Sequence, residues 1–156
     1  MFVFTVEAEQ EAGKILAKYP VKLSALLPLL HLAQDQEGYV TPGAMVEIGK
    51  RLEVSPAYVQ SVCTFYTMFH TRPVGRYIIL FCHNISCHLL GADDLLNYTA
   101  GKLGIEVGNT TADRKFTLLR EECLAGCCGA PMMRVNEIFY ERLTRERIDE
   151  ILDALP

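Results

Sequence analysis

Four cysteines in the second half of the chain have the type and spacing of a metal site. Cys82 and Cys87 form a C-x4-C pair, and Cys123 and Cys127 form a C-x3-C pair. Each pair is close enough in sequence for one loop to direct both sulfurs to the same point. Each iron of a [2Fe–2S] cluster takes a tetrahedron of sulfur that two protein thiolates complete. We therefore interpret these four cysteines as the ligands of a [2Fe–2S] cluster.

Spacing alone leaves other chemistry open for these thiols. Zinc also binds four thiolates, but its usual knuckle is C-x2-C, which is shorter than both pairs here. A disulfide within each pair is sterically possible, although a cytosolic setting disfavours it. A thioredoxin-type dithiol requires C-x-x-C, which this sequence lacks. His83 and His88 allow a Rieske-like site with two cysteines and two histidines.

The residues around the second pair favour a cluster. A negatively charged cluster needs backbone N–H donors near its sulfurs. We expect Gly126 and Gly129 to let the backbone approach the sulfurs closely, and Pro131 to fix the chain as it leaves the site. Cys128 adjoins Cys127, so its side chain should point elsewhere. We interpret it as a spectator, with a ligand exchange between the two left open.

Both cysteine pairs follow predicted strands. Residues 76–81 form a near-continuous apolar run that delivers Cys82 at its end, as in a strand buried on both faces. Further strands are predicted over 116–120, 132–136 and 138–140, with a tight hairpin between the last two. Helices are predicted over 87–103, with an irregularity near Gly91, and after Thr144. The order β-α-β-β-α suggests a small mixed sheet with helices packed on it, like a thioredoxin fold.

The sequence of the first half predicts a compact helical bundle that carries no catalytic or metal-binding residues. Apolar periodicity predicts four helices, over residues 7–19, 24–36, 42–52 and 56–66. The last two begin with a capping residue that is followed by proline. Residues 71–75 resemble a linker. We expect an α+β protein, with a helical N-terminal domain over 1–72 and a thioredoxin-like [2Fe–2S] domain over 73–156.

Three features of the first half are expected to be structural. His31 should be a satisfied, half-buried histidine, and Cys63 a buried, inert thiol. The aromatic cluster of Phe65, Tyr66 and Phe69 should serve packing rather than bind a cofactor.

Composition excludes several classes of function. The chain has 156 residues, a net charge of −4 and no run of Lys or Arg, so nucleic acid is not expected as a partner. Its apolar stretches are too short or broken to span a bilayer, and the N-terminus lacks the pattern of a secretory signal. Six cysteines without such a signal indicate metal or redox chemistry.

These motifs together resemble a known family, the thioredoxin-like [2Fe–2S] E subunits of NADH:quinone oxidoreductase (respiratory complex I). The resemblance extends from Tyr19 to Leu155. The matching stretches are residues 19–20, 24–30, 36–39, 64–69, 73–75, 82–87, 103–105, 116–118, 122–124 and 130–136. Two departures stand out: Asp113 is followed by Arg114 where the family usually has glycine, and the family rarely has cysteine at position 128.

The resemblance implies electron transfer rather than bond-making by side chains. It implies that Cys82, Cys87, Cys123 and Cys127 bind the cluster, close to the FMN of a partner flavoprotein that oxidises NADH. No G-x-G-x-x-G motif occurs here, in agreement with nucleotide binding elsewhere. We expect no substrate site on this chain, further Fe–S subunits as partners, and a cytoplasmic position peripheral to the inner membrane of a bacterium. By analogy, we expect the helical half to bind the flavoprotein.

Three other settings remain open. The chain could be the equivalent [2Fe–2S] subunit of an NAD-linked hydrogenase or formate dehydrogenase. A free ferredoxin carrier would not need the helical first half. A zinc-stabilised structural subunit would be colourless and redox-silent.

Overall fold

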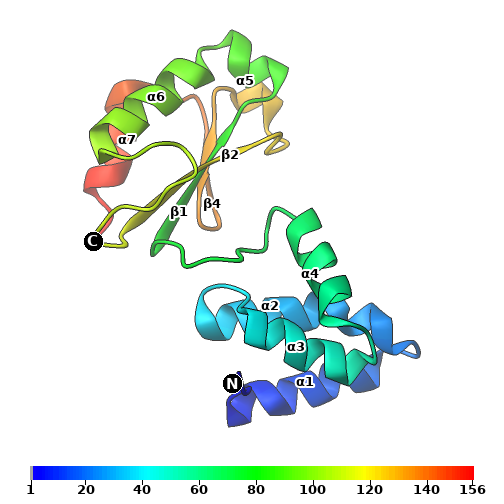
Figure 1. Cartoon of the computed structure of the whole chain (residues 1–156). Helices are drawn as coiled ribbons and strands as arrows, with labels where there is room; N and C mark the ends of the chain where they lie inside the picture. Colours follow the sequence, from blue (N-terminus) through cyan, green and yellow to red (C-terminus); the bar gives the residue numbers. More distant parts are fainter. Residues whose placement is uncertain (1) are drawn as a thin grey trace. The chain divides into compact units, whose positions relative to one another are not determined.

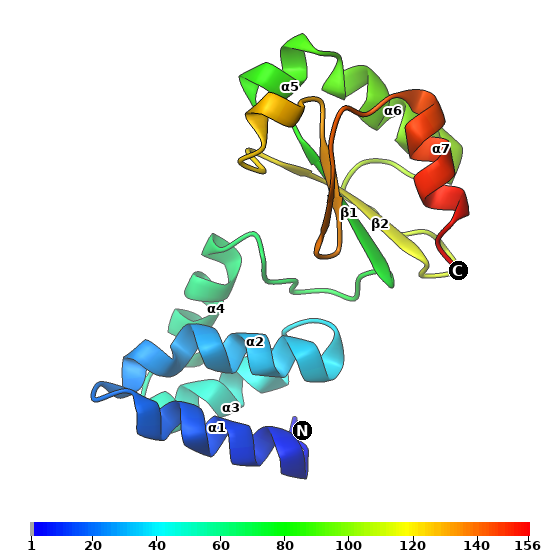
Figure 2. The ribbon, with the colours of Figure 1, turned by 180° about the vertical axis from the view of Figure 1, so that it is seen from behind.

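The computed structural model describes residues 2–156, and the chain divides into two compact units between Pro73 and Val74 (Figures 1 and 2). The first unit is entirely helical and the second is a sheet with helices. No helix within residues 2–156 is long and apolar enough to cross a membrane.

The helices of the first unit begin at capping residues that the sequence identifies. The Thr41 and Ser55 hydroxyls accept hydrogen bonds from backbone N–H groups three residues on, at 3.1 and 3.2 Å, and a proline follows each. The elements are α1 (Val6–Lys18), the 3-10 helix η1 (Lys22–Ala25), α2 (Leu26–Glu37), α3 (Pro42–Leu52) and α4 (Pro56–Phe65).

The second helix begins two residues later than predicted. Residues Lys22–Ala25 form a 3-10 turn, and no side chain caps the start of α2. Pro28 is the third residue of α2, where its missing N–H costs nothing because the first four N–H groups of a helix have no partner within it.

The core of the first unit is built around α2, whose Leu29 and Leu30 are fully buried. Cys63 is also fully buried, as predicted, and burial raises the pKa of its thiol. The expectation for His31 was wrong: the side chain is exposed, and its ring lies 4.8 Å from that of Phe69. Phe69 is buried, whereas Phe65 is 77% exposed on the surface of α4.

The second unit contains a four-stranded sheet of order β2-β1-β3-β4. β1 runs parallel to β2, while β3 is antiparallel to both β1 and β4. The strands are β1 (Tyr77–Cys82), β2 (Phe116–Glu121), β3 (Met133–Val135) and β4 (Ile138–Tyr140), and the helices are α5 (Ile85–Leu89), α6 (Ala92–Leu103), the 3-10 helix η2 (Cys127–Gly129) and α7 (Arg145–Asp153).

Helices α6 and α7 pack on the same face of this sheet (Figures 1 and 2). Leu96 of α6 and Ile148 of α7 meet Ile79 of β1 and Leu118 of β2 in one buried cluster. The predicted strands and helices are confirmed, and the irregularity at Gly91 is a left-handed residue (φ 85°) that separates α5 from α6.

Arg114 shows how the unusual turn before β2 forms without glycine. It adopts the left-handed conformation, with φ 57°, that the family's usual glycine would favour. The side chain of Asp113 accepts a hydrogen bond from the N–H of Lys115 at 2.9 Å and closes the turn. The sequence Asp113-Arg114 therefore forms a tight turn without glycine.

Replacing Leu118 by alanine is expected to destabilise the second unit by about 2–5 kcal/mol, because the side chain is fully buried between the sheet and its helices. Urea unfolding followed by circular dichroism measures the loss. Leu119→Ala is the matched control, since Leu119 is only half-buried. An equal loss in both variants would contradict this description of the core.

Candidate metal centre

The parallel pairing of β1 with β2 brings both cysteine pairs to one end of the sheet. Cys82, the last residue of β1, is in register with Glu121, the last residue of β2. The N–H of His83 donates to the carbonyl of Glu121 at 3.1 Å, which extends the pairing one residue further. Cys123 follows two residues after β2. Figures 1 and 2 show α5 and the loop after β2 side by side at this end.

The first pair is assembled and buried. Asn84 precedes the short helix α5, whose turn returns Cys87 to Cys82. Both side chains are 1% exposed. Burial, with the neighbouring sulfurs of Cys82 and Cys127, raises the pKa of Cys87 to about 11, while the N–H of Met132 acts in the opposite direction.

A thiol with this pKa is protonated at neutral pH, so a metal must displace its proton on binding. The Met132 N–H that lowers the pKa of Cys87 stabilises the resulting thiolate in the same way. The buried pair is therefore equipped to bind metal rather than to react as a free nucleophile.

The second pair lies on an exposed loop. Cys123, Cys127 and the neighbouring Cys128 are all exposed. The loop turns at Ala125, which is left-handed with φ 59° and whose N–H donates to the sulfur of Cys123 at 3.3 Å. The 3-10 turn η2 then carries Cys127 and ends at Gly129. Sequence patterns contain no signal for a left-handed alanine, so this turn was not foreseen.

Two side chains lie close to Gly126 and Gly129, in the space that a Cβ atom would occupy. A Cβ at Gly126 would lie 2.6 Å from the sulfur of Met132, which is 1% exposed. A Cβ at Gly129 would lie 2.6 Å from Cγ of Glu141. Met132 and Glu141 thus shape the loop, and sequence reasoning gave neither a role. The peptide before Pro131 is cis.

The two histidines beside the first pair are engaged with carboxylates. Nε2 of His83 lies 3.2 Å from Glu122, and Nδ1 of His88 lies 2.7 Å from Asp93. His83 and Glu122 adjoin Cys82 and Cys123, so their contact joins the two loops. One ring nitrogen of each histidine is thus occupied by a carboxylate contact.

The donor set consists of two cysteine pairs that leave neighbouring strands. One tetrahedral zinc ion takes four thiolates at a single point. A [2Fe–2S] cluster instead takes two thiolates at each iron. The structure supplies one buried pair and one exposed pair at the same end of the sheet. One sulfur in each pair accepts a backbone hydrogen bond: Cys87 in the first pair and Cys123 in the second.

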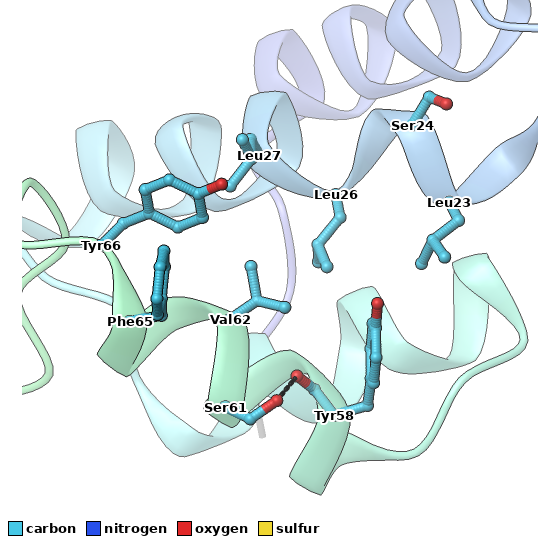
Figure 3. A pocket seen from close by; sticks show the side chains of 9 residues that line it. All are labelled: Leu23, Ser24, Leu26, Leu27, Tyr58, Ser61, Val62, Phe65 and Tyr66. Atoms are coloured by element: carbon cyan, nitrogen blue, oxygen red, sulfur yellow. Dashed lines mark hydrogen bonds between the residues drawn. The ribbon is translucent and has the colours of Figure 1, made fainter.

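A second candidate site is an apolar groove on the first unit, with a volume of about 570 Å³ (Figure 3). Phe65 and Tyr58 of α4 stand at its surface, 77% and 44% exposed. Exposed aromatic residues around an apolar hollow are typical of protein interfaces. The groove is lined by Leu23, Ser24, Leu26, Leu27, Tyr58, Ser61, Val62, Phe65 and Tyr66.

Comparison with known proteins gives consistent matches. The family model described as thioredoxin-like [2Fe-2S] ferredoxin matches residues 12–156. The chain is 39% identical to the second E subunit of the NADH-quinone oxidoreductase of Rhizobium meliloti, over 96% of this chain and 88% of that protein. It is 40% identical to the E subunit of the NADH-quinone oxidoreductase of Rickettsia conorii, over 99% and 94%.

A solved structure also matches, the air-oxidized state of an NAD+-reducing [NiFe]-hydrogenase. The TM-score is 0.74 at 27% identity, over 83% of this chain and 22% of that one. The chain thus corresponds to about a fifth of a longer hydrogenase chain.

Gly126→Ala is expected to lower the iron bound per purified chain and to destabilise the second unit by about 1–3 kcal/mol, because the new methyl group meets the buried Met132 sulfur. Iron analysis and thermal unfolding measure the two effects. Gly101→Ala is the control, since Gly101 lies inside α6 with open space around its Cα and alanine favours a helix there. Full iron content in Gly126→Ala would refute the packing argument.

Proposed function

The chain belongs to the thioredoxin-like [2Fe–2S] ferredoxin family, and from this premise we propose that it is the electron-transfer subunit of an NADH:quinone oxidoreductase. The α+β thioredoxin-like fold, the resemblance to the E subunits and the [2Fe–2S] cofactor predicted from the sequence are confirmed. The proposal adds that the cluster lies near the FMN of a partner flavoprotein that oxidises NADH. The proposal assigns no substrate site to this chain.

One observation carries this proposal: two parallel strands end together and each continues into a pair of cysteines. Cys82, Cys87, Cys123 and Cys127 are the proposed ligands. When bound, the cluster supplies a site that accepts and returns one electron at a time. Burial of Cys82 and Cys87 excludes water from one side of the site, and the N–H groups of Met132 and Ala125 stabilise thiolate charge.

The partner surface proposed for the flavoprotein is the apolar groove of the first unit (Figure 3). The helical unit contributes none of the four ligand cysteines, yet it exposes Phe65, Tyr58 and Leu23 around one hollow. Aromatic residues in such positions commonly supply most of the binding energy of an interface. In the assembled complex the chain would lie in the cytoplasm, held at the inner membrane through further Fe–S subunits.

The alternative is an equivalent subunit of an NAD-linked hydrogenase or formate dehydrogenase. The match to the NAD+-reducing hydrogenase, at a TM-score of 0.74, favours the first of these. The same four cysteines and the same flavin partner would serve in either setting. The other subunits that co-purify with the chain discriminate between them.

The proposal is tested by visible absorption and EPR spectra of anaerobically purified protein, before and after dithionite. Wild-type protein should be red-brown and give the paramagnetic signal of a reduced [2Fe–2S] cluster. Cys127→Ala should lose at least about nine-tenths of both signals, because the cluster then lacks one of its four thiolates.

Cys128→Ser and Cys63→Ser are the matched controls and should keep the wild-type spectra. Cys128 adjoins a proposed ligand, while Cys63 is buried in the other unit. A colourless, zinc-containing wild-type protein would overturn the electron-transfer proposal. Retained cluster signals in Cys127→Ala would instead overturn the ligand assignment and point to the adjacent Cys128 as a substitute ligand.

Phe65→Ser is expected to weaken binding to the co-purifying flavoprotein at least about tenfold, since it removes the most exposed aromatic ring of the groove. Titration calorimetry with the separate subunits measures the affinity. Val46→Ser is the control, because Val46 is 40% exposed on α3 but does not line the groove. Equal affinities of the two variants would assign flavoprotein binding to another surface.

A further inference from the structure

Glu141 lies against the loop that carries the second cysteine pair. It follows β4 directly, and its side chain occupies the space beside two glycines of that loop. Cγ of Glu141 would be 2.6 Å from a Cβ at Gly129, and its Oε1 would be 3.6 Å from a Cβ at Gly126. The two glycines flank Cys127 and Cys128, so the carboxylate is placed at the turn that holds the fourth proposed ligand.

The backbone after Glu141 binds the same loop. The N–H of Arg142 donates to the carbonyl of Gly129 at 2.7 Å, and the N–H of Leu143 donates to that of Pro131 at 2.9 Å. Leu143 is itself buried in the core of the second unit. Glu141 is an exposed residue, but the chain that bears it is attached to the loop and to the core.

Glu141 forms no ion pair within residues 2–156, where the ion pairs involve other acidic groups. Glu122, another carboxylate of the site, is in contact with His83. Glu141 thus contributes a fixed negative charge beside the ligands.

From this geometry we propose that Glu141 is a positioning residue for the loop of Cys123 and Cys127, and that its carboxylate lowers the reduction potential of the cluster. The inference rests on the proposed ligand assignment. The step concerned is addition of one electron to the cluster, which makes it more negative. A nearby negative charge opposes that addition, and hydrogen bonds and charge around the sulfurs set the potential.

The experiment is an EPR-monitored redox titration of the full chain carrying its cluster, with dithionite as reductant. Glu141→Gln keeps the shape of the side chain and removes its charge. The ratio of reduced to oxidised cluster at a given solution potential should rise about three- to tenfold, which is a positive shift of ~28–59 mV for a one-electron couple. Glu141→Lys should shift the potential further in the same direction.

Glu137→Gln is the matched control. It removes the same charge from the β3–β4 turn, and because β3 runs antiparallel to β1 this turn lies at the opposite end of the sheet from the ligand loops. Its potential should equal that of wild type. Glu141→Asp keeps the charge and provides a second measurement if Glu141→Gln loads little cluster. Its ratio of reduced to oxidised cluster should stay within about 1.5-fold of wild type, well below the change expected for loss of the charge.

The outcomes separate this inference from the proposed function. A wild-type chain without a [2Fe–2S] spectrum overturns the proposed function. A loaded wild type with unchanged potentials in Glu141→Gln and Glu141→Lys overturns only the role of Glu141. Equal shifts in Glu141→Gln and Glu137→Gln would also overturn it, because the effect would then reflect net charge rather than position.

Discussion

The parallel pairing of β1 with β2 is the constraint on which the rest of the structure depends. Its register places Cys82 beside Glu121, so both chains leave the sheet at the same level. A parallel pair needs a long crossover connection, and α5 and α6 with the loop to β2 provide it. Because Cys82 and Glu121 end the two strands together, the loops that follow carry thiols from separate parts of the chain to one place.

The site that results is asymmetric. Cys82 and Cys87 lie in a small buried cluster with Met132, whereas Cys123 and Cys127 lie on an exposed loop. Burial raises the pKa of Cys87, so this side opposes free thiolate, while the exposed side is open to solvent and to other molecules. An electron carrier benefits from both properties, because one side limits water and the other allows close approach of a partner.

The helical unit combines a buried core with an exposed apolar groove. Its core is complete around α2, with Leu29, Leu30 and Cys63 buried. Phe65 and Tyr58 nevertheless remain exposed at the groove. These two aromatic side chains are therefore not part of the buried core. The chain thus separates the residues proposed for electron transfer from the surface proposed for binding a partner.

By itself, the sequence determined the elements and the identity of the candidate ligands. Thr41-Pro42 and Ser55-Pro56 predicted helix starts correctly, since caps and prolines act locally. The apolar run before Cys82 predicted a buried strand, and the two cysteine spacings pointed to the cofactor that the family confirms. Each of these signals lies within a few residues of the feature that it predicts.

Only the tertiary structure decided which neighbours surround the thiols. Glu141 reaches Gly129 because the β3–β4 hairpin folds back beside the loop, and Met132 fills the space at Gly126 for the same reason. The contact between the rings of His31 and Phe69 likewise joins residues distant in sequence. No local pattern records such contacts, because they arise only when separate segments pack against one another.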